Sequence, residues 1–124
     1  MNMEVFRKLH DEKEVRRYYV GGALGVDMWA AEQILRLKEQ PGYEDIELVV
    51  ALPFVGHDAK WDQRSKRRME FILQHCSKKE VIGNEDCRES YVKRNCYMVD
   101  QANYLVAVYD DARNLRSGTM QCVW

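Results

Sequence analysis

The sequence predicts an α/β domain with a Rossmann-like, three-layer architecture and a mostly parallel sheet of about four strands. Short apolar runs typical of buried parallel strands alternate with longer segments in which apolar residues recur at helical spacing. A glycine-rich segment joins the first of these strands to the next helix. The 124 residues are 46% hydrophobic and 31% charged, a composition that supports one core without disulfides or a structural metal. We therefore expect residues 1–124 to form a single domain.

Each expected element has its own signal. In chain order, we expect a helix over 3–16, a strand over 18–20, a helix over 26–40, a strand over 46–52, a helix over 61–76, a weak strand over 80–82, a helix over 91–102 and a strand over 104–109. The first helix has only a thin apolar stripe, whereas the second has a broad one that ends at Pro41. Asp58 is the expected N-cap of the third helix. The runs IELVVAL and YLVAVY are the clearest strands because they are almost continuously apolar.

Charge and hydropathy exclude several classes of protein. The 19 Lys and Arg residues nearly balance the 20 Asp and Glu residues, and the isoelectric point is near 6.3, which argues against a bulk electrostatic grip on nucleic acid. The longest uncharged stretch, residues 48–57, is far too short for a membrane-spanning helix. The first 17 residues lack the apolar segment of a secretory signal. We expect a soluble, cytoplasmic protein.

The cysteines predict buried thiols rather than a metal site or a redox pair. None of Cys76, Cys87, Cys96 and Cys122 forms the C-x-x-C pair that zinc ribbons and redox sites use. Cys96 falls on the apolar side of an expected helix. We therefore expect no metal and no disulfide.

The segment GGALGVD, residues 21–27, is the most informative of three loops expected at the carboxyl ends of the strands, where such folds bind ligands. Glycine lacks a Cβ, so Gly21, Gly22 and Gly25 can take positive φ and let the main chain approach a phosphate at a helix N-terminus. A tight turn without a ligand is the alternative interpretation. The segment does not match the dinucleotide fingerprint G-x-G-x-x-G.

Four blocks of sequence carry a resemblance to a known family: GGALGVDMWAAE (21–32), ALPFVGHDAKW (51–61), RNCYMVDQANYLVAVYD (94–110) and SGT (117–119). Together they resemble the YpsA-like branch of the SLOG superfamily, which also contains the DNA-processing protein DprA (Smf) and the LOG phosphoribohydrolases. The resemblance implies a Rossmann-like fold with a nucleotide or a nucleotide derivative at the carboxyl ends of the strands. Compared with that family, the chain looks short at both ends, as a truncated form or a divergent short member would.

The candidate ligand-binding residues lie in these blocks. They are Gly21, Gly22, Gly25, Asp27, Phe54, Trp61, Arg94, Asn95, Asp110, Ser117, Gly118 and Thr119. Arginine offers a planar fork for phosphate, asparagine can read a base edge, aromatic rings can stack on a base, and the backbone and hydroxyls of 117–119 can form a second anion cradle. Each has a structural alternative: Asp27 can simply favour the helix N-terminus, the two aromatic residues can pack on each other, and a buried Asn95 can hold a neighbouring loop.

The leading hypothesis is a domain that binds a nucleotide or a nucleotide derivative, with no certain cofactor beyond that ligand. One alternative is LOG-like hydrolysis of a nucleoside monophosphate, but Cys122 stands where the LOG signature P-G-G-x-G-T-x-x-E has its glutamate, and a thiol cannot replace that carboxylate in acid–base catalysis. Another is single-stranded DNA binding as in DprA, favoured by the basic run over residues 60–68. A partner-binding domain with a vestigial pocket is the last. We therefore expect a non-catalytic binding domain.

Self-association is a further expectation. The YpsA-like and LOG relatives tend to self-associate, and a sheet short at both ends would expose unpaired strand edges. The predicted contact residues are Trp29 and the apolar end over 120–124, because aromatic and Met residues are enriched in interfaces. The expected partners are thus a nucleotide-type ligand and a second copy of the chain, with no membrane contact.

Overall fold

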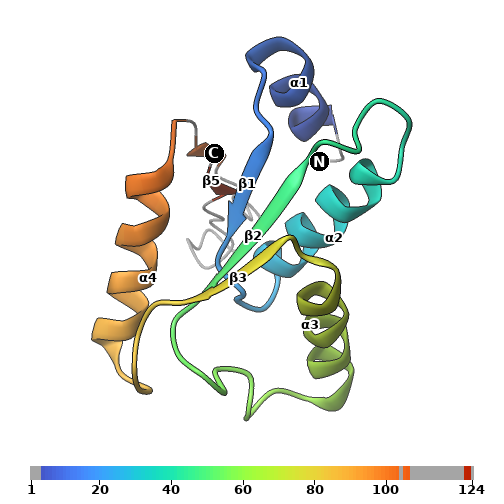
Figure 1. The fold of residues 1–124 in the computed structure, drawn as a ribbon. Coiled ribbons are helices and arrows are strands. Elements are labelled where there is room, and N and C mark those ends of the chain that lie inside the picture. The colour runs from blue at the N-terminus through green and yellow to red at the C-terminus, as the bar shows by residue number, and fades with distance from the viewer. Residues whose placement is uncertain (1–3, 104, 107–121, 124) are drawn as a thin grey trace, which may run out of the picture.

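The computed structural model describes residues 4–103, 105–106 and 122–123 and shows a sheet with helices on both faces (Figure 1). In chain order the elements are α1 (Glu4–Lys13), β1 (Arg17–Val20), α2 (Val26–Lys38), β2 (Glu47–Leu52), α3 (Gln63–His75), β3 (Lys78–Val81), α4 (Arg88–Gln101), β4 (Leu105–Val106) and β5 (Cys122–Val123). The alternation of strands and helices expected from the sequence is confirmed.

Within the described residues, the sheet contains five strands in the order β3-β2-β1-β5-β4. Strands β1, β2 and β3 are parallel, with Val20 opposite Val50 and Leu52 opposite Val81. Strand β5 lies antiparallel between β1 and β4. Of the expected strand over 104–109, the structure describes only β4, and residues 117–119, the expected second anion cradle, lie outside the described residues. Residues 122–123 beyond them form a strand.

Side chains of β1 and β2 alternate between two core clusters, which fixes the three layers. Tyr18 and Val20 belong to the larger cluster, which α2 and α3 cover. Tyr19, Val49 and Ala51 point to the opposite face and pack with Met98 of α4. Because strand side chains alternate in direction, the nearly continuous apolar run of β2 serves both clusters. Figure 1 shows α4 on one side of the sheet and α2 and α3 on the other.

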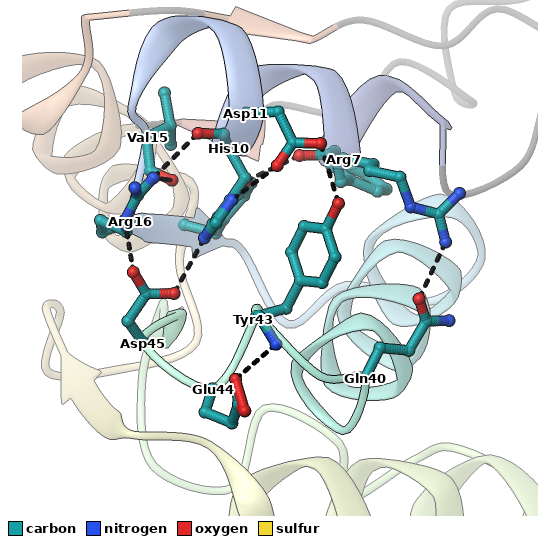
Figure 2. Close-up of polar contacts among 12 residues, drawn as sticks. Arg7, His10, Asp11, Val15, Arg16, Gln40, Tyr43, Glu44 and Asp45 are labelled. Carbon is teal, nitrogen blue, oxygen red and sulfur yellow. Dashed lines mark hydrogen bonds and ion pairs between the residues drawn. The ribbon is translucent and has the colours of Figure 1, made fainter.

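Helix α1 is attached by an apolar residue and by a charged cluster around His10 (Figure 2). Phe6 is completely buried, and its ring meets the edge of Tyr18 at a centroid distance of 6.1 Å. His10, 6% exposed, lies with Nδ1 3.0 Å from Asp11 Oδ1 and Nε2 2.8 Å from Asp45 Oδ1. The first contact is within α1, while the second joins α1 to the loop that precedes β2.

Two further side chains close this cluster. Arg16 Nη1 donates to the backbone oxygen of His10 at 2.9 Å, and its Nε pairs with Asp45. The Tyr43 hydroxyl donates to Asp11 Oδ2 at 2.8 Å, and the rings of Tyr43 and His10 lie 4.6 Å apart. Hydrogen bonding to His10 is the main cause that lowers the pKa of both aspartates. We call His10, Asp11, Arg16, Tyr43 and Asp45 the His10 cluster.

Two sequence-based expectations are wrong. Asp62, not Asp58, caps α3: its carboxylate accepts from the Ser65 backbone N–H at 3.1 Å and from the Ser65 hydroxyl at 2.7 Å. Asp58 belongs instead to the loop before the helix. Cys96 is exposed rather than buried, because α4 turns Ser90, Arg94 and Met98 toward the protein. The sequence pattern predicted an apolar inner face for this helix, but an arginine and a serine are among the residues that face inward.

Of the helices in the described residues, none is long and apolar enough to cross a membrane.

Candidate functional site

The loop after β1 brings Gly22 against the carboxyl end of β2. Gly22 has φ +43°, a conformation that side chains disfavour, and a Cβ placed there would lie 2.5 Å from Leu52 Cδ2. The backbone oxygen of Gly22 accepts a hydrogen bond from His57 Nε2 at 2.8 Å. The carboxyl ends of β1 and β2 are adjacent, so this bond ties together the two loops that leave them. Gly22 is therefore required by packing and backbone geometry, whatever it binds.

Gly21 instead faces two charged side chains. A Cβ at this position would lie 2.9 Å from Arg94 Nη1 and 3.0 Å from Asp27 Oδ2. The absence of a side chain thus leaves room in which a guanidinium from α4 and a carboxylate from α2 approach the same stretch of backbone. These groups are far apart in sequence and come from opposite layers of the domain.

Asp27 lies in the first turn of α2 and helps to shape the loop. Its Oδ2 accepts from the Ala23 backbone N–H at 3.2 Å. Burial raises the pKa of Asp27 to about 6, against the lowering effects of that hydrogen bond and of the Arg94 charge. Gly25 is the N-cap residue with φ 84°, and a Cβ there would meet open space. Its positive φ, rather than close packing, favours glycine at this position.

Arg94 is 7% exposed, which is unusual for arginine. Its Nε donates to Asn95 Oδ1 at 2.8 Å, and its guanidinium carbon lies 5.8 Å from the centre of the Tyr91 ring. Among the described residues, no carboxylate lies within ion-pairing distance of Arg94. Burial lowers the pKa of Arg94, and the nearby Asp27 carboxylate partly offsets that effect. In the part of the chain that the structure describes, the two terminal nitrogens of this buried cation have no hydrogen-bond partner, and they can contact an anion.

Asn95 is exposed and touches Arg94, so the expected alternative of a buried Asn95 holding a neighbouring loop is wrong. Its amide oxygen orients the guanidinium by accepting a hydrogen bond from Nε at the edge of that planar group. The pair that the sequence predicted is therefore joined by a hydrogen bond, and the cation rather than the amide is the buried member.

The two aromatic candidates pack with other residues. Phe54 is 7% exposed, and its ring meets the edge of Tyr91 at 5.7 Å. Trp61 is half-buried, contacts the larger core cluster and lies edge-on to His57 at 5.1 Å. Phe54 thus packs against Tyr91, which contacts Arg94, and Trp61 packs against His57, which donates to Gly22 in the loop. A buried, edge-packed Phe54 has no free face on which a base can stack.

The structure therefore brings Gly21, Gly22, Asp27, Arg94 and Asn95 together, with Phe54 and Trp61 behind them. Asp110, Ser117, Gly118 and Thr119 lie outside the described residues.

The sequence did not single out His57 or Tyr91 as site residues. His57 follows β2, the neighbour of β1, and that adjacency was the available signal. Tyr91 stands one helical turn before Arg94, a spacing that predicts contact when Arg94 faces inward.

Burial lowers the pKa of His57, so its neutral form is favoured at pH 7. Since the Gly22 carbonyl can only accept, Nε2 carries the proton of that neutral ring. No group of three or more His, Cys, Asp or Glu side chains in the described part of the chain is placed to hold a metal ion.

By its fold and loop geometry the chain is a Rossmann-like α/β domain, with a glycine-rich loop and a buried arginine at the carboxyl edge of its parallel strands. The profile of the YpsA family, described as the YspA SLOG family, matches residues 3–121, so the chain belongs to this family.

Relatives of this chain are UPF0398 proteins. One from Staphylococcus epidermidis is 28% identical over 94 residues, which is 74% of this chain and 49% of the relative. Others, from Bacillus cereus and Bacillus thuringiensis, are 28% identical over 96 residues, which is 76% of this chain and 51% of each relative. The chain spans about half the length of these relatives.

Proposed function

We propose that this chain binds a phosphate-bearing, nucleotide-type ligand at the loop over residues 21–27, with Arg94 as the main anion contact. The observation that carries the proposal is the buried guanidinium of Arg94, which has no carboxylate partner within ion-pairing distance among the described residues. Leaving a buried charge unpaired is costly, so such a group indicates a partner that binds from outside. Membership in a SLOG family supports a nucleotide-related ligand in general terms.

The roles of the remaining residues follow from their contacts. Gly21 leaves the space between Arg94 and Asp27 open for a ligand oxygen. Asp27 can accept a hydrogen bond from a ribose hydroxyl when it is ionised, while it repels a phosphate on the same side. Its placement opposite Arg94 thus favours a ligand that carries a phosphate and a hydroxyl a few bonds apart. Asn95 keeps the guanidinium oriented through its hydrogen bond to Nε.

The test is a calorimetric titration with ADP-ribose, AMP and cyclic nucleotides. Arg94→Ala removes a charge-assisted contact and is expected to weaken the bound member of this panel by about 1.5 to 3 kcal/mol, or roughly 10- to 150-fold. Arg67→Ala, which removes an exposed arginine of α3, is the matched control and should leave the affinity unchanged. Equal affinity in Arg94→Ala and the parent would exclude Arg94 from the site.

Gly21→Ala supplies an independent probe of the same space. The new methyl group meets only the ends of flexible side chains, so the fold should adjust while the gap between Arg94 and Asp27 is filled. We expect weaker binding with little loss of stability. Gly22→Val is unsuitable for this purpose, because its Cβ strikes Leu52 in the core.

Single-stranded DNA is the less supported ligand. In the basic run, Arg68 is already held by Glu32 through two hydrogen bonds of 3.1 and 2.6 Å. Lys60, Arg64 and Arg67 remain exposed. Salt-dependent binding of an oligonucleotide that falls in Arg67→Ala but not in Arg94→Ala would favour DNA over a mononucleotide.

Hydrolysis of a nucleoside monophosphate is the enzymatic alternative. Release of free base from AMP, measured at high protein concentration, would support it, while binding without turnover supports a non-catalytic domain.

A further inference from the structure

The outward face of α4 carries an apolar stripe. Val92 is 48% exposed and Val99 is 53% exposed, and the exposed Cys96 lies between them. These residues are spaced i, i+4 and i+7, so they line one face of the helix. The opposite face holds Ser90, Arg94 and Met98, which are buried. Helix α4 therefore has an inner face that belongs to the candidate site and an outer apolar face that none of the described residues covers.

Two exposed charges of opposite sign flank this stripe. Lys93 and Asp100 are seven residues apart, which places them on the same flank of the helix two turns from each other. In the described part of the chain, neither side chain has an ion-pair partner. Their separation is too large for a salt bridge with each other, so both are available to groups on another molecule.

The arrangement is complementary to itself. When two copies of α4 pack antiparallel about a two-fold axis, the same flank of each helix faces the other, as in antiparallel coiled coils. Lys93 of one copy then lies opposite Asp100 of the other, and the reverse pair forms symmetrically. The midpoint between Lys93 and Asp100 falls beside Cys96, so the two Cys96 residues meet close to the axis, with Val92 of each copy against Val99 of the other.

We propose that the outer face of α4 is the contact surface of a two-fold, antiparallel dimer of this chain. The surface differs from the one that the sequence suggested, because Trp29 packs against the core and its ring lies 6.3 Å from that of Phe6. Of the other residues suggested, 120–124, only strand β5 (Cys122–Val123) belongs to the described part of the chain. A contact made by one helix from each copy is small, so the dimer dissociates at micromolar concentrations and forms as the concentration rises.

Sedimentation equilibrium over a concentration series, in reducing buffer and without nucleotide, tests the dimer separately from ligand binding. The parent should convert from monomer to dimer across the series. Val99→Asp should abolish the dimer. Lys93→Asp places two aspartates opposite each other and should weaken it, while Lys93→Asp combined with Asp100→Lys restores complementary pairs and should recover it. Lys8→Ala, an exposed change on α1, is the control.

Disulfide trapping tests the position of the axis. Oxidation by diamide removes one electron and one proton from each of two facing thiols and joins them. The trapping is done in a Cys122→Ser background, so that Cys76, Cys87 and Cys96 are the remaining thiols. In this background the chain at high concentration should give a covalent dimer, and the further change Cys96→Ser should give none, because Cys76 and Cys87 are only partly exposed. A monomer throughout the series, a dimer that is insensitive to the charge reversals, or a covalent dimer that persists in Cys96→Ser would overturn the proposal.

Discussion

The His10 cluster and the Arg94 region each bury a basic side chain, but among the described residues only His10 has carboxylates within ion-pairing distance. His10 lies between two aspartates, one of which also pairs with Arg16, and Tyr43 donates to the other (Figure 2). Arg94 is buried to a similar degree as His10, yet its only hydrogen bond among the described residues is to the neutral Asn95. One cluster is closed by groups of the chain itself, whereas the other leaves a cation partly unmatched.

The difference separates a structural role from a binding role. In the His10 cluster, favourable contacts offset the desolvation of the imidazole and fix α1 against the loop before β2. Near Gly21, burial raises the pKa of Asp27 and lowers the pKa of Arg94, so each charged form is disfavoured by its surroundings. Titratable groups whose pKa values are strongly shifted by their surroundings are typical of ligand sites. Substitutions in the His10 cluster should therefore reduce stability and leave ligand affinity unchanged. Substitution of Arg94 should reduce ligand affinity and change stability little.

The largest effect on stability is expected where the glycine loop meets the core. Gly22→Val introduces a Cβ that clashes with Leu52 and requires a positive φ, and it should destabilise the fold by about 3 kcal/mol or more. Gly21→Ala, one residue away, should cost far less, because only side-chain ends must move. Denaturant unfolding measures both variants. A well-folded Gly22→Val would show that the loop is less tightly constrained than its geometry indicates.

The next largest effect belongs to the His10 cluster. His10→Ala removes the ring whose two nitrogens contact Asp11 and Asp45 and leaves these carboxylates facing a small cavity, so we expect a loss of about 2 kcal/mol. Nucleotide affinity should not change, because the cluster is remote from Gly21. Lys8→Ala, which alters an exposed residue of the same helix, is the control for thermal unfolding. A His10→Ala variant as stable as that control would contradict a structural role.

Asp27→Asn should act in the opposite direction and stabilise the free protein at pH 7. A carboxyl whose pKa is about 6 when folded and 3.8 when unfolded binds protons more tightly in the folded state. Its ionisation therefore reduces stability as pH rises from about 4 to 6, and the cost is complete at pH 7. Removing it should recover roughly 1 to 3 kcal/mol. The gain should vanish near pH 4, and a variant that is less stable at pH 7 would show that the Ala23 hydrogen bond dominates.

The order and type of the described helices and parallel strands were predictable, because the spacing of apolar residues along the chain reflects which side chains each element buries. The run IELVVAL predicted a strand covered on both faces, and β2 contributes to both clusters. The N-cap of α3 was placed four residues early, since Asp58 and Asp62 are chemically equal and only the tertiary path of the loop decides between them. The antiparallel insertion of β5 was missed, because two residues carry no periodic signal.

The candidate site was predicted in part, through its glycines and its arginine. Local sequence indicated a turn at Gly21 and Gly22, but not that Gly22 is required by contact with Leu52. Arginine was recognised as a ligand candidate, while its burial depended on which face of α4 turns inward. The contact between His57 and the Gly22 carbonyl depends on strand order, which no single segment encodes.

The smallest effect on stability is expected for Arg94→Ala in the absence of ligand. The variant loses packing around the guanidinium, but it also removes a buried cation that has no ionised partner within ion-pairing distance among the described residues, and these contributions oppose each other. We expect a change within about 1 kcal/mol, combined with the large loss of nucleotide affinity described above.

Urea unfolding with and without saturating ligand measures both quantities on one sample series. Because a ligand stabilises only a protein that binds it, the ligand should raise the unfolding midpoint of the parent and of Arg67→Ala, and not that of Arg94→Ala. A loss of stability above about 2 kcal/mol without ligand would instead make Arg94 a structural residue, comparable with His10, and the contrast between the two regions would disappear.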